Sequence, residues 1–167
     1  MKSIISIDKI NELTKDDFID IFGNVFEKTN WIADRAYNSK PYKNFNELSS
    51  IMIKIYENST KEDFLKIFNA HPELAVEKSL TEDSQKEQNN SNLNKCTEDE
   101  FNEFLSLNNK YNKKFGFPFI IAVKGKSKNE ILENFRKRIE NKIELEFKEA
   151  KEQVKQIATS RINKIID

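Results

Sequence analysis

Apolar residues recur along most of the chain at intervals of three and four, which is the spacing of one face of an α-helix. The first such stripe follows Thr14 and Asp17, whose spacing is typical of a helix N-cap and its third residue. Its members are Phe18, Ile21, Phe22, Val25 and Phe26. The pattern therefore predicts a first helix that begins after Thr14 and carries all five apolar residues.

Three further helices are predicted before residue 71. Their apolar stripes are, in order, Trp31, Ile32 and Ala36; Leu48, Ile51, Met52, Ile55 and Tyr56; and Phe64, Leu65, Ile67 and Phe68. Thr60 and Asp63 have the spacing that begins the last of these helices. Because a proline disfavours helical dihedral angles in the residue before it, this helix should end at His71, which precedes Pro72.

Later helices are predicted by their N-capping residues, which are Thr81, Thr97 with Glu100, and Ser127 with Glu130. The helix after Thr97 should end at Gly116, which is placed to adopt the left-handed conformation of a C-cap. The last helix carries an apolar stripe at Phe147, Ala150, Val154, Ile157, Ala158 and Ile165.

The periodicity fails in one place, the continuous apolar run FPFIIAV at Phe117–Val123. Because the chain offers no second strand-like run to pair with it, we interpret it as an extended segment and not as a strand of a sheet. Its backbone N–H and C=O groups would then lack a ladder partner, which buried backbone groups rarely do. A ligand could take some of these hydrogen bonds.

These elements predict an all-α fold. The 167 residues suit one domain with a single core, and no repeat or low-complexity linker marks a boundary. We expect one compact helical domain over residues 1–167, with about seven to nine helices and the Phe117–Val123 segment crossing its core.

Composition narrows the possible functions. The 28 basic residues balance the 28 acidic ones, which argues against attraction of the whole molecule to nucleic acid or to an anionic membrane. The single cysteine, Cys96, excludes an internal disulfide and a cysteine-cluster zinc site, and the single histidine excludes a metal site that needs two. The N-terminal residues lack the apolar run of a signal peptide or membrane span, so we expect a cytoplasmic protein.

The candidate chemistry is concentrated between residues 69 and 88. The only histidine, His71, ends one helix, and Ser84, Glu87 and Gln88 stand at i, i+3 and i+4 on the next. An acid/base group, a carboxylate and two hydrogen-bonding groups could therefore converge there. Taken alone, a histidine at a helix end more often hydrogen-bonds the last carbonyls of the helix, and a single glutamate is typical of a solvated helix face.

One arginine has an unusual position. Arg161 falls within the apolar stripe of the last helix instead of on the charged face opposite. A guanidinium on an apolar face needs a carboxylate, a phosphate or exposed carbonyl groups. The alternative is that Arg161 extends to solvent near the end of the helix, where a positive charge is also favoured.

The order of the short motifs resembles a known family. AHPEL is followed by LTEDSQKEQ, LNNKYNKKFGFPFIIAVKG, RIEN and the terminal QIATSRI, and FGNVFEKTNWIA precedes them. Nearly the whole chain is thus similar to the 2-oxo-4-hydroxy-4-carboxy-5-ureidoimidazoline (OHCU) decarboxylase family of ureide-forming purine catabolism. HPxL alone is a weak signal, but together with SxxEQ and FGFPFI in this order it is a strong one.

The resemblance implies an all-helical homodimeric carboxy-lyase that converts OHCU to S-allantoin and carbon dioxide in urate degradation, with neither metal nor organic cofactor. By the same resemblance His71, Glu87 and Arg161 are the catalytic residues. The positions that match substrate-contacting residues of the family are Pro72, Ser84, Gln88, and the backbone of Phe119, Ile120, Ile121, Ala122 and Val123.

Two alternatives stay open. The chain departs from the family pattern at Val76, where many relatives have glycine, at Asn89–Asn94, and in a short connection from His71 to Ser84. A family member with a different substrate would keep the polar groups but lack activity on OHCU. The second alternative is a non-enzymatic helical module that presents the Phe117–Val123 segment to a nucleic acid or an acidic protein, with salt-dependent binding. It would use the flanking lysines, Lys113, Lys114, Lys124, Lys126 and Lys128.

Overall fold

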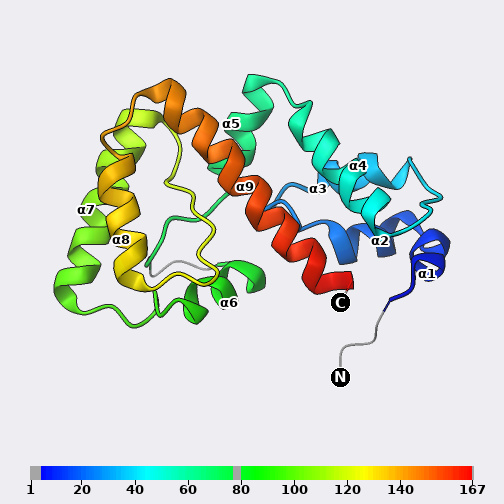
Figure 1. Ribbon diagram of the computed structural model, residues 1–167, viewed down its shortest axis with the longest axis horizontal. Coiled ribbons are helices and arrows are strands. Elements are labelled where there is room, and N and C mark those ends of the chain that lie inside the picture. The colour runs from blue at the N-terminus through cyan, green and yellow to red at the C-terminus, as the bar shows by residue number, and fades with distance from the viewer. Residues whose placement is uncertain (1–4, 77–79, 167) are drawn as a thin grey trace. The chain divides into compact units, whose positions relative to one another are not determined.

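The structure is a computed structural model that describes residues 5–76 and 80–166 (Figure 1). Within these ranges the chain forms nine helices and no strand. The predicted all-α fold is therefore confirmed, and the number of helices agrees with the prediction. In the same ranges, no helix is both long and apolar enough to cross a membrane.

In chain order the helices are α1 (Ile7–Glu12), α2 (Lys15–Phe22), α3 (Asn30–Tyr37), α4 (Phe45–Glu57), α5 (Lys61–Asn69), α6 (Glu82–Asn90), α7 (Glu98–Phe115), α8 (Lys128–Arg138) and α9 (Ile143–Ile166). The apolar pattern does not predict α1, because this helix has six residues and buries only Ile10.

The predicted helix ends are present. Each capping side chain accepts a hydrogen bond from the backbone N–H three residues further along the chain. The capping residues are Thr14, Thr81, Thr97 and Ser127. Thr97 and Glu100 form a complete capping box, and Gly116 ends α7 in the left-handed conformation with a φ of 79°. Since the first N–H groups of a helix have no partner within it, these side chains fix the helix starts locally.

The chain divides into two compact units. Unit 1 comprises Met1–Ile67 and Lys155–Asp167, and unit 2 comprises Phe68–Val154. Helix α9 contributes residues to both units. The single domain over residues 1–167 stays a prediction.

Unit 1 buries aromatic rings among its N-terminal helices. Helix α3 packs against α2 and α4. The rings of Phe18 and Phe22 lie 4.8 Å apart between centroids, and Phe26 stacks on Tyr56 at 4.9 Å. Aromatic pairs at such distances add to the stability that burial itself provides.

The prediction that the first helix carries Val25 and Phe26 is wrong. Helix α2 ends at Phe22, and a turn follows in which the side chain of Asn24 accepts a hydrogen bond from the N–H of Lys28. Glycine at position 23 and a turn-forming asparagine favour leaving the helix here. Val25 and Phe26 are nevertheless buried, so their apolar character reports on the core and not on the helix.

In unit 2 the Phe117–Val123 segment has no regular secondary structure and is buried over most of its length, as predicted. It follows α7 and precedes α8, and these two helices pack against each other. The ring of Phe119 stacks on Phe135 with centroids 3.9 Å apart and an angle of 7° between the planes. Aromatic packing therefore holds the segment where no ladder of backbone hydrogen bonds does.

Candidate functional site

His71 lies two residues beyond the end of α5, in the connection to α6. The helix stops at Asn69, close to the position that Pro72 predicts. The side chain of His71 is buried, with only 8% of the residue exposed, and its Nε2 atom is inaccessible to solvent. Its backbone N–H donates to the carbonyl of Phe68 at 3.1 Å. The imidazole is therefore buried.

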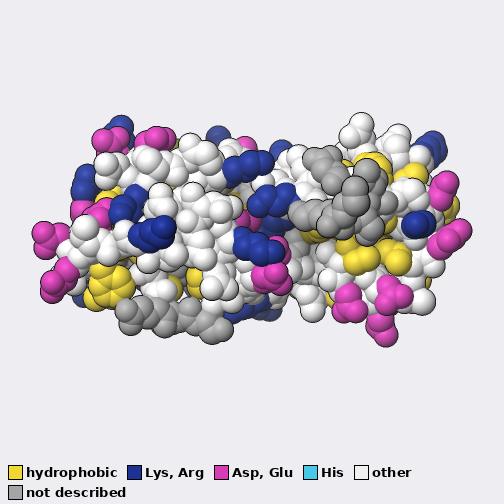
Figure 2. Space-filling model, turned by 90° about the horizontal axis from the view of Figure 1, so that it is seen from below, with side chains coloured by type: hydrophobic (Ala, Val, Ile, Leu, Met, Phe, Trp, Pro, Cys, Tyr) yellow, Lys and Arg dark blue, Asp and Glu magenta, His cyan; other side chains and the backbone are white. Residues whose placement is uncertain are grey.

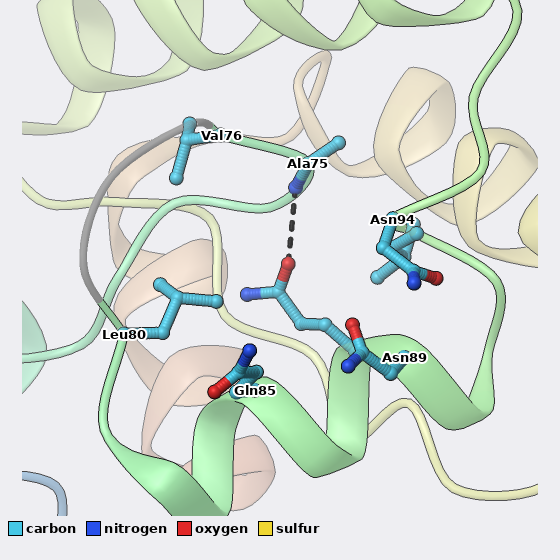
Figure 3. Close-up of a pocket in the computed structure, with 8 residues that line it drawn as sticks. Ala75, Val76, Leu80, Gln85, Asn89 and Asn94 are labelled. Carbon is cyan, nitrogen blue, oxygen red and sulfur yellow. Dashed lines mark hydrogen bonds between the residues drawn. The ribbon is translucent and has the colours of Figure 1, made fainter.

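The loop that follows His71 is anchored by two helices. Gln88 of α6 accepts a hydrogen bond from the N–H of Ala75 at 3.1 Å, which is the dashed line in Figure 3. It also donates to the carbonyl of Glu73 at 3.2 Å. Asn108 of α7 donates to the carbonyl of Leu74 at 3.0 Å. Side-chain amides thus bind three successive residues of this loop, which fixes the chain just after the histidine. Further on, the connection includes residues 77–79, which lie outside the described ranges.

Helix α6 presents the predicted polar face. Thr81 caps it by accepting a hydrogen bond from the N–H of Ser84. Ser84 and Gln88 are buried, and Glu87 is half-buried between them. The spacing of hydroxyl, carboxylate and amide on one face is therefore confirmed. Gln88 also has a structural role, because its amide group binds the loop after His71.

A cavity of about 310 Å³ opens beside α6 within unit 2. Figure 3 shows Gln85 and Asn89 of α6 at its edge, with Leu80 and Val76 across from them. Its lining residues are Ala75, Val76, Leu80, Gln85, Gln88, Asn89, Leu93 and Asn94. Gln88 is the predicted site residue that borders it, and the positions where the chain departs from the family pattern, Val76 and Asn89–Asn94, contribute much of the rest.

The predicted backbone segment is held by side chains from three directions. The carbonyl of Ile120 accepts from Arg138 of α8 at 2.7 Å, and the N–H of Ala122 donates to Gln153 of α9 at 2.8 Å. The carbonyl of Val123 accepts from the hydroxyl of Ser91, just after α6, at 2.9 Å. These bonds attach both the middle and the end of the segment to the surrounding helices.

Other backbone groups of the segment remain available. Within the described ranges, no hydrogen bond is formed by the N–H of Ile120 or by the N–H and C=O of Phe119 and Ile121. These residues are buried. Buried backbone groups are nearly always satisfied, and the binding of a ligand by these groups stays a prediction.

Arg161 lies in unit 1, on the part of α9 that belongs to it. It is 4% exposed, so it does not extend to solvent. Its Nη2 lies 3.2 Å from Oε2 of the fully buried Glu27, and its Nη1 donates to the carbonyl of Asn24 at 2.8 Å. Of the partners that the sequence analysis named for this arginine, a carboxylate and a carbonyl group are present. Its convergence with His71 and Glu87, which belong to unit 2, stays a prediction.

Two groups of buried charges escaped the sequence analysis. One is Glu27, the partner of Arg161. The other is a cluster of Tyr111, Arg138, Asn141 and Glu146 in unit 2. Arg161 was singled out because a charged residue stood at helical spacing from apolar ones, and the same spacing could have revealed two members of this cluster. Arg138 follows the buried Phe135 by three residues, and Glu146 precedes the buried Ala150 by four.

Three of the five lysines around the extended segment have partners within the protein. Lys114 donates to the carbonyl of Ile139, Lys126 to that of Ala122, and Lys128 pairs with Glu100 at 3.0 Å. Figure 2 shows acidic as well as basic side chains on the face it presents. A surface that binds nucleic acid would need a concentration of positive charge, so the binding-module alternative is not favoured.

Neither a reactive thiol nor a metal cluster is indicated in the described ranges. Burial raises the pKa of the Cys96 thiol, which reduces the thiolate fraction at neutral pH. No group of three or more histidine, cysteine, aspartate or glutamate side chains is arranged to hold a metal ion there. The candidate chemistry therefore stays with the residues of the motifs.

Comparison with known proteins gives consistent results. A family model described as OHCU decarboxylase matches residues 11–163. A 2-oxo-4-hydroxy-4-carboxy-5-ureidoimidazoline decarboxylase of Haloferax volcanii is 32% identical over 158 residues, which are 95% of this chain and 94% of that protein.

Two longer proteins are also similar. The uric acid degradation bifunctional protein of Bacillus sp. (strain TB-90) is 40% identical over 162 residues, which are 97% of this chain and 32% of that protein. The crystal structure of an (S)-allantoin synthase aligns with a TM-score of 0.79 and 26% identity, covering 98% of this chain and 54% of that one. The chain thus spans about a third of the length of the Bacillus relative and about half of the synthase.

Proposed function

Because the chain belongs to the OHCU decarboxylase family, we propose that it converts OHCU to S-allantoin and carbon dioxide, with neither metal nor organic cofactor. The observation that carries this proposal is the buried His71 on a loop that α6 and α7 anchor. His71 belongs to one of the sequence motifs of this family, and a buried imidazole suits proton transfer in a site with little water.

The chemistry requires little beyond binding and proton transfer. When the bond from the ring to the carboxylate breaks, carbon dioxide leaves and the electron pair moves into the adjacent imine-like ring system. The hydroxyl group becomes the carbonyl of allantoin by losing its proton, and one proton is added to the carbon that becomes the stereocentre. The ring nitrogen that receives the electron pair takes up a second proton, which balances the negative charge of the lost carboxylate. The protein therefore needs to hold the carboxylate out of the ring plane, exclude water and deliver a proton to one face.

We assign roles to three side chains on this basis. His71 transfers the proton linked to the hydroxyl or to the new stereocentre, since an imidazole group can exchange a proton near neutral pH. Glu87 holds the imidazole tautomer or binds the hydroxyl. Arg161 binds an anionic or carbonyl oxygen through its planar guanidinium. The contacts of Arg161 with Glu27 and Asn24 support this role, because they restrict the orientation of the guanidinium.

The remaining contacts come from Pro72, Ser84, Gln88 and the Phe119–Val123 backbone. The N–H and C=O groups of Phe119 and Ile121 support this assignment, because they are buried and lack hydrogen bonds within the described ranges. Backbone groups in a fixed extended segment can bind the amide-like edges of a ureide ring without moving. We also propose a homodimer in the cytoplasm, and light scattering at several protein concentrations would test the dimer.

The test uses freshly generated OHCU and the circular dichroism of allantoin. We expect His71→Asn to lower the rate of S-allantoin formation by about 10²-fold or more, because a positioned general acid or base contributes that much. Glu87→Gln should also reduce the rate. Its matched control is Glu82→Gln, which makes the same change at an exposed carboxylate of α6 and should leave the rate within about twofold.

Three results would contradict parts of the proposal. Turnover of His71→Asn within a few-fold of wild type removes the histidine from the mechanism. Equal losses in Glu87→Gln and Glu82→Gln remove the specific role of Glu87. A folded wild-type chain that gives racemic allantoin at the uncatalysed rate would support the alternative of a family member with another substrate.

A further inference from the structure

The fully buried carboxylate of Glu146 is the centre of a polar cluster in unit 2. It accepts hydrogen bonds from the Tyr111 hydroxyl at 2.5 Å and from Asn141 at 3.0 Å. Arg138 donates to both of its oxygens, with Nε at 3.1 and 3.2 Å and Nη2 at 2.9 Å. Burial and the adjacent carboxylate raise the pKa of Tyr111, which keeps its hydroxyl a donor. The carboxylate is therefore saturated by groups from α7, α8 and the turn between α8 and α9.

A third nitrogen of Arg138 reaches the extended segment. Its Nη1 donates to the carbonyl of Ile120 at 2.7 Å. Its guanidinium also lies over the ring of Phe119, with Cζ 4.4 Å from the ring centroid. The same ring stacks on Phe135. Arg138 thus contacts two successive residues of the segment, one through the backbone and one through the side chain.

These contacts determine how the free backbone groups point. Arg138 fixes the carbonyl of Ile120 on one side of Ile121, and Gln153 fixes the N–H of Ala122 on the other. Because the peptide unit is planar, fixing the carbonyl of Ile120 also sets the direction of the N–H of Ile121. In the same way, fixing the N–H of Ala122 sets the direction of the Ile121 carbonyl.

We propose that Arg138 is a positioning residue for the proposed decarboxylation, which orients the backbone of Ile121 toward the substrate, and that Glu146, Tyr111 and Asn141 hold its guanidinium in place. This inference rests on the proposed function. A buried ion pair is seldom more stabilising than apolar residues of the same size, so stability alone gives little reason for one here. A planar, forked donor that binds a carboxylate and a carbonyl at once gives a geometric reason.

The decisive variant is Arg138→Lys. Lysine keeps the positive charge beside Glu146, but its single ammonium cannot reproduce the fork, the stacking on Phe119 and the bond to Ile120 together. Small displacements of a binding group have large effects on catalysis. We expect KM for OHCU to rise about tenfold with a smaller change in kcat, since a backbone contact present before and during the reaction contributes mainly to binding.

Hydrogen exchange provides a readout that does not depend on activity. In Arg138→Lys, the peptide that spans Phe119–Val123 should exchange faster, whereas α7 should exchange as in wild type. The matched control is Arg136→Lys on the same helix, which changes an exposed ion pair with Glu103. This control should keep KM within about twofold and leave the exchange of the segment unchanged.

A second variant guards against a folding defect. Tyr111→Phe removes one of the hydrogen bonds that hold Glu146, but it does not change Arg138 or its bond to Ile120. Because Glu146 then holds the guanidinium less firmly, KM for OHCU should rise by about threefold. Wild-type KM and exchange in both Arg138→Lys and Tyr111→Phe would overturn the inference, as would equal effects of Arg138→Lys and Arg136→Lys. If the wild-type chain does not convert OHCU, the proposed function fails on its own, and the orienting role of Arg138 is still decided by the exchange of the segment.

Discussion

Helix α8 carries two arginine–glutamate pairs that differ mainly in burial. Arg136 binds Glu103 through two bonds of 2.6 Å, and 52% and 34% of the two side chains are exposed. Arg138, two residues further on, binds Glu146, and only 9% and 0% of these side chains are exposed. The same chemical pair therefore occurs in water on one side of the helix and in the core on the other.

The comparison shows that bond geometry alone does not determine how much an ion pair contributes to stability. At the surface, water screens the charges and the side chains lose entropy on pairing, so such a pair contributes about 0–1 kcal/mol. In the core, each charge depends on its partner, because an unpaired buried charge is very unfavourable. The exposed pair has the shorter bonds, yet the buried pair should matter far more.

The largest expected effect follows from breaking the buried pair. Arg138→Met leaves Glu146 buried without its cation, so the free energy of unfolding should fall by about 3–5 kcal/mol in urea denaturation. The double variant Arg138→Met with Glu146→Leu removes both charges and should recover most of this loss. A single variant that costs less than about 1 kcal/mol would show that the other donors or water satisfy the carboxylate of Glu146 without the cation.

An intermediate effect is expected from Tyr111→Phe, which removes one donor to Glu146. The free energy of unfolding should fall by about 1–3 kcal/mol at neutral pH, because a buried acceptor loses a partner. Urea denaturation against wild type measures this change. The matched comparison is Tyr37→Phe, which removes the hydroxyl of a half-buried tyrosine and should lower the free energy of unfolding much less.

The same tyrosine predicts a dependence on alkaline pH. Burial raises the pKa of Tyr111 in the folded protein, and burial does the same for Tyr42. Above the ordinary tyrosine pKa of about 10, the unfolded chain releases protons that the folded chain retains. The contribution of these tyrosines to the free energy of unfolding is therefore fully present below pH 10 and decreases as the pH rises further. Tyr111→Phe should make this decrease shallower, and an unchanged slope would contradict the assignment.

The smallest effect is expected at the exposed pair. The hydrogen bond with Arg136 lowers the pKa of Glu103 in the folded protein, so its contribution is present above the unfolded pKa and is lost as the pH falls through the folded value. Because solvent screens this pair, Glu103→Gln should change the free energy of unfolding by less than about 1 kcal/mol at pH 7. The difference from wild type should disappear in acid. A larger change that persists at low pH would mean that Glu103 acts through packing.

Local signals in the sequence were sufficient for most helix boundaries. Thr97 with Glu100 and Ser127 with Glu130 begin helices as predicted, since a cap is made by neighbours three residues apart. The prediction that Val25 and Phe26 belong to the first helix failed because their burial depends on more than local spacing. Their spacing continued the helical stripe, but the turn after Gly23 brings them into the core by another route. Periodicity reports burial, and burial does not require a helix.

The sequence by itself determined the all-α class, the isolated extended segment, the polar face of α6 and the place of Arg161 on an apolar stripe, because each depends on spacing within one element. Only the tertiary structure decided which distant groups meet. Glu27 with Arg161 and Glu146 with Arg138 are pairs formed by packing, as is the anchoring of the loop after His71 by Gln88 and Asn108. The free energy of burying a charge or an amide depends on what surrounds it, and those surroundings come from remote parts of the chain.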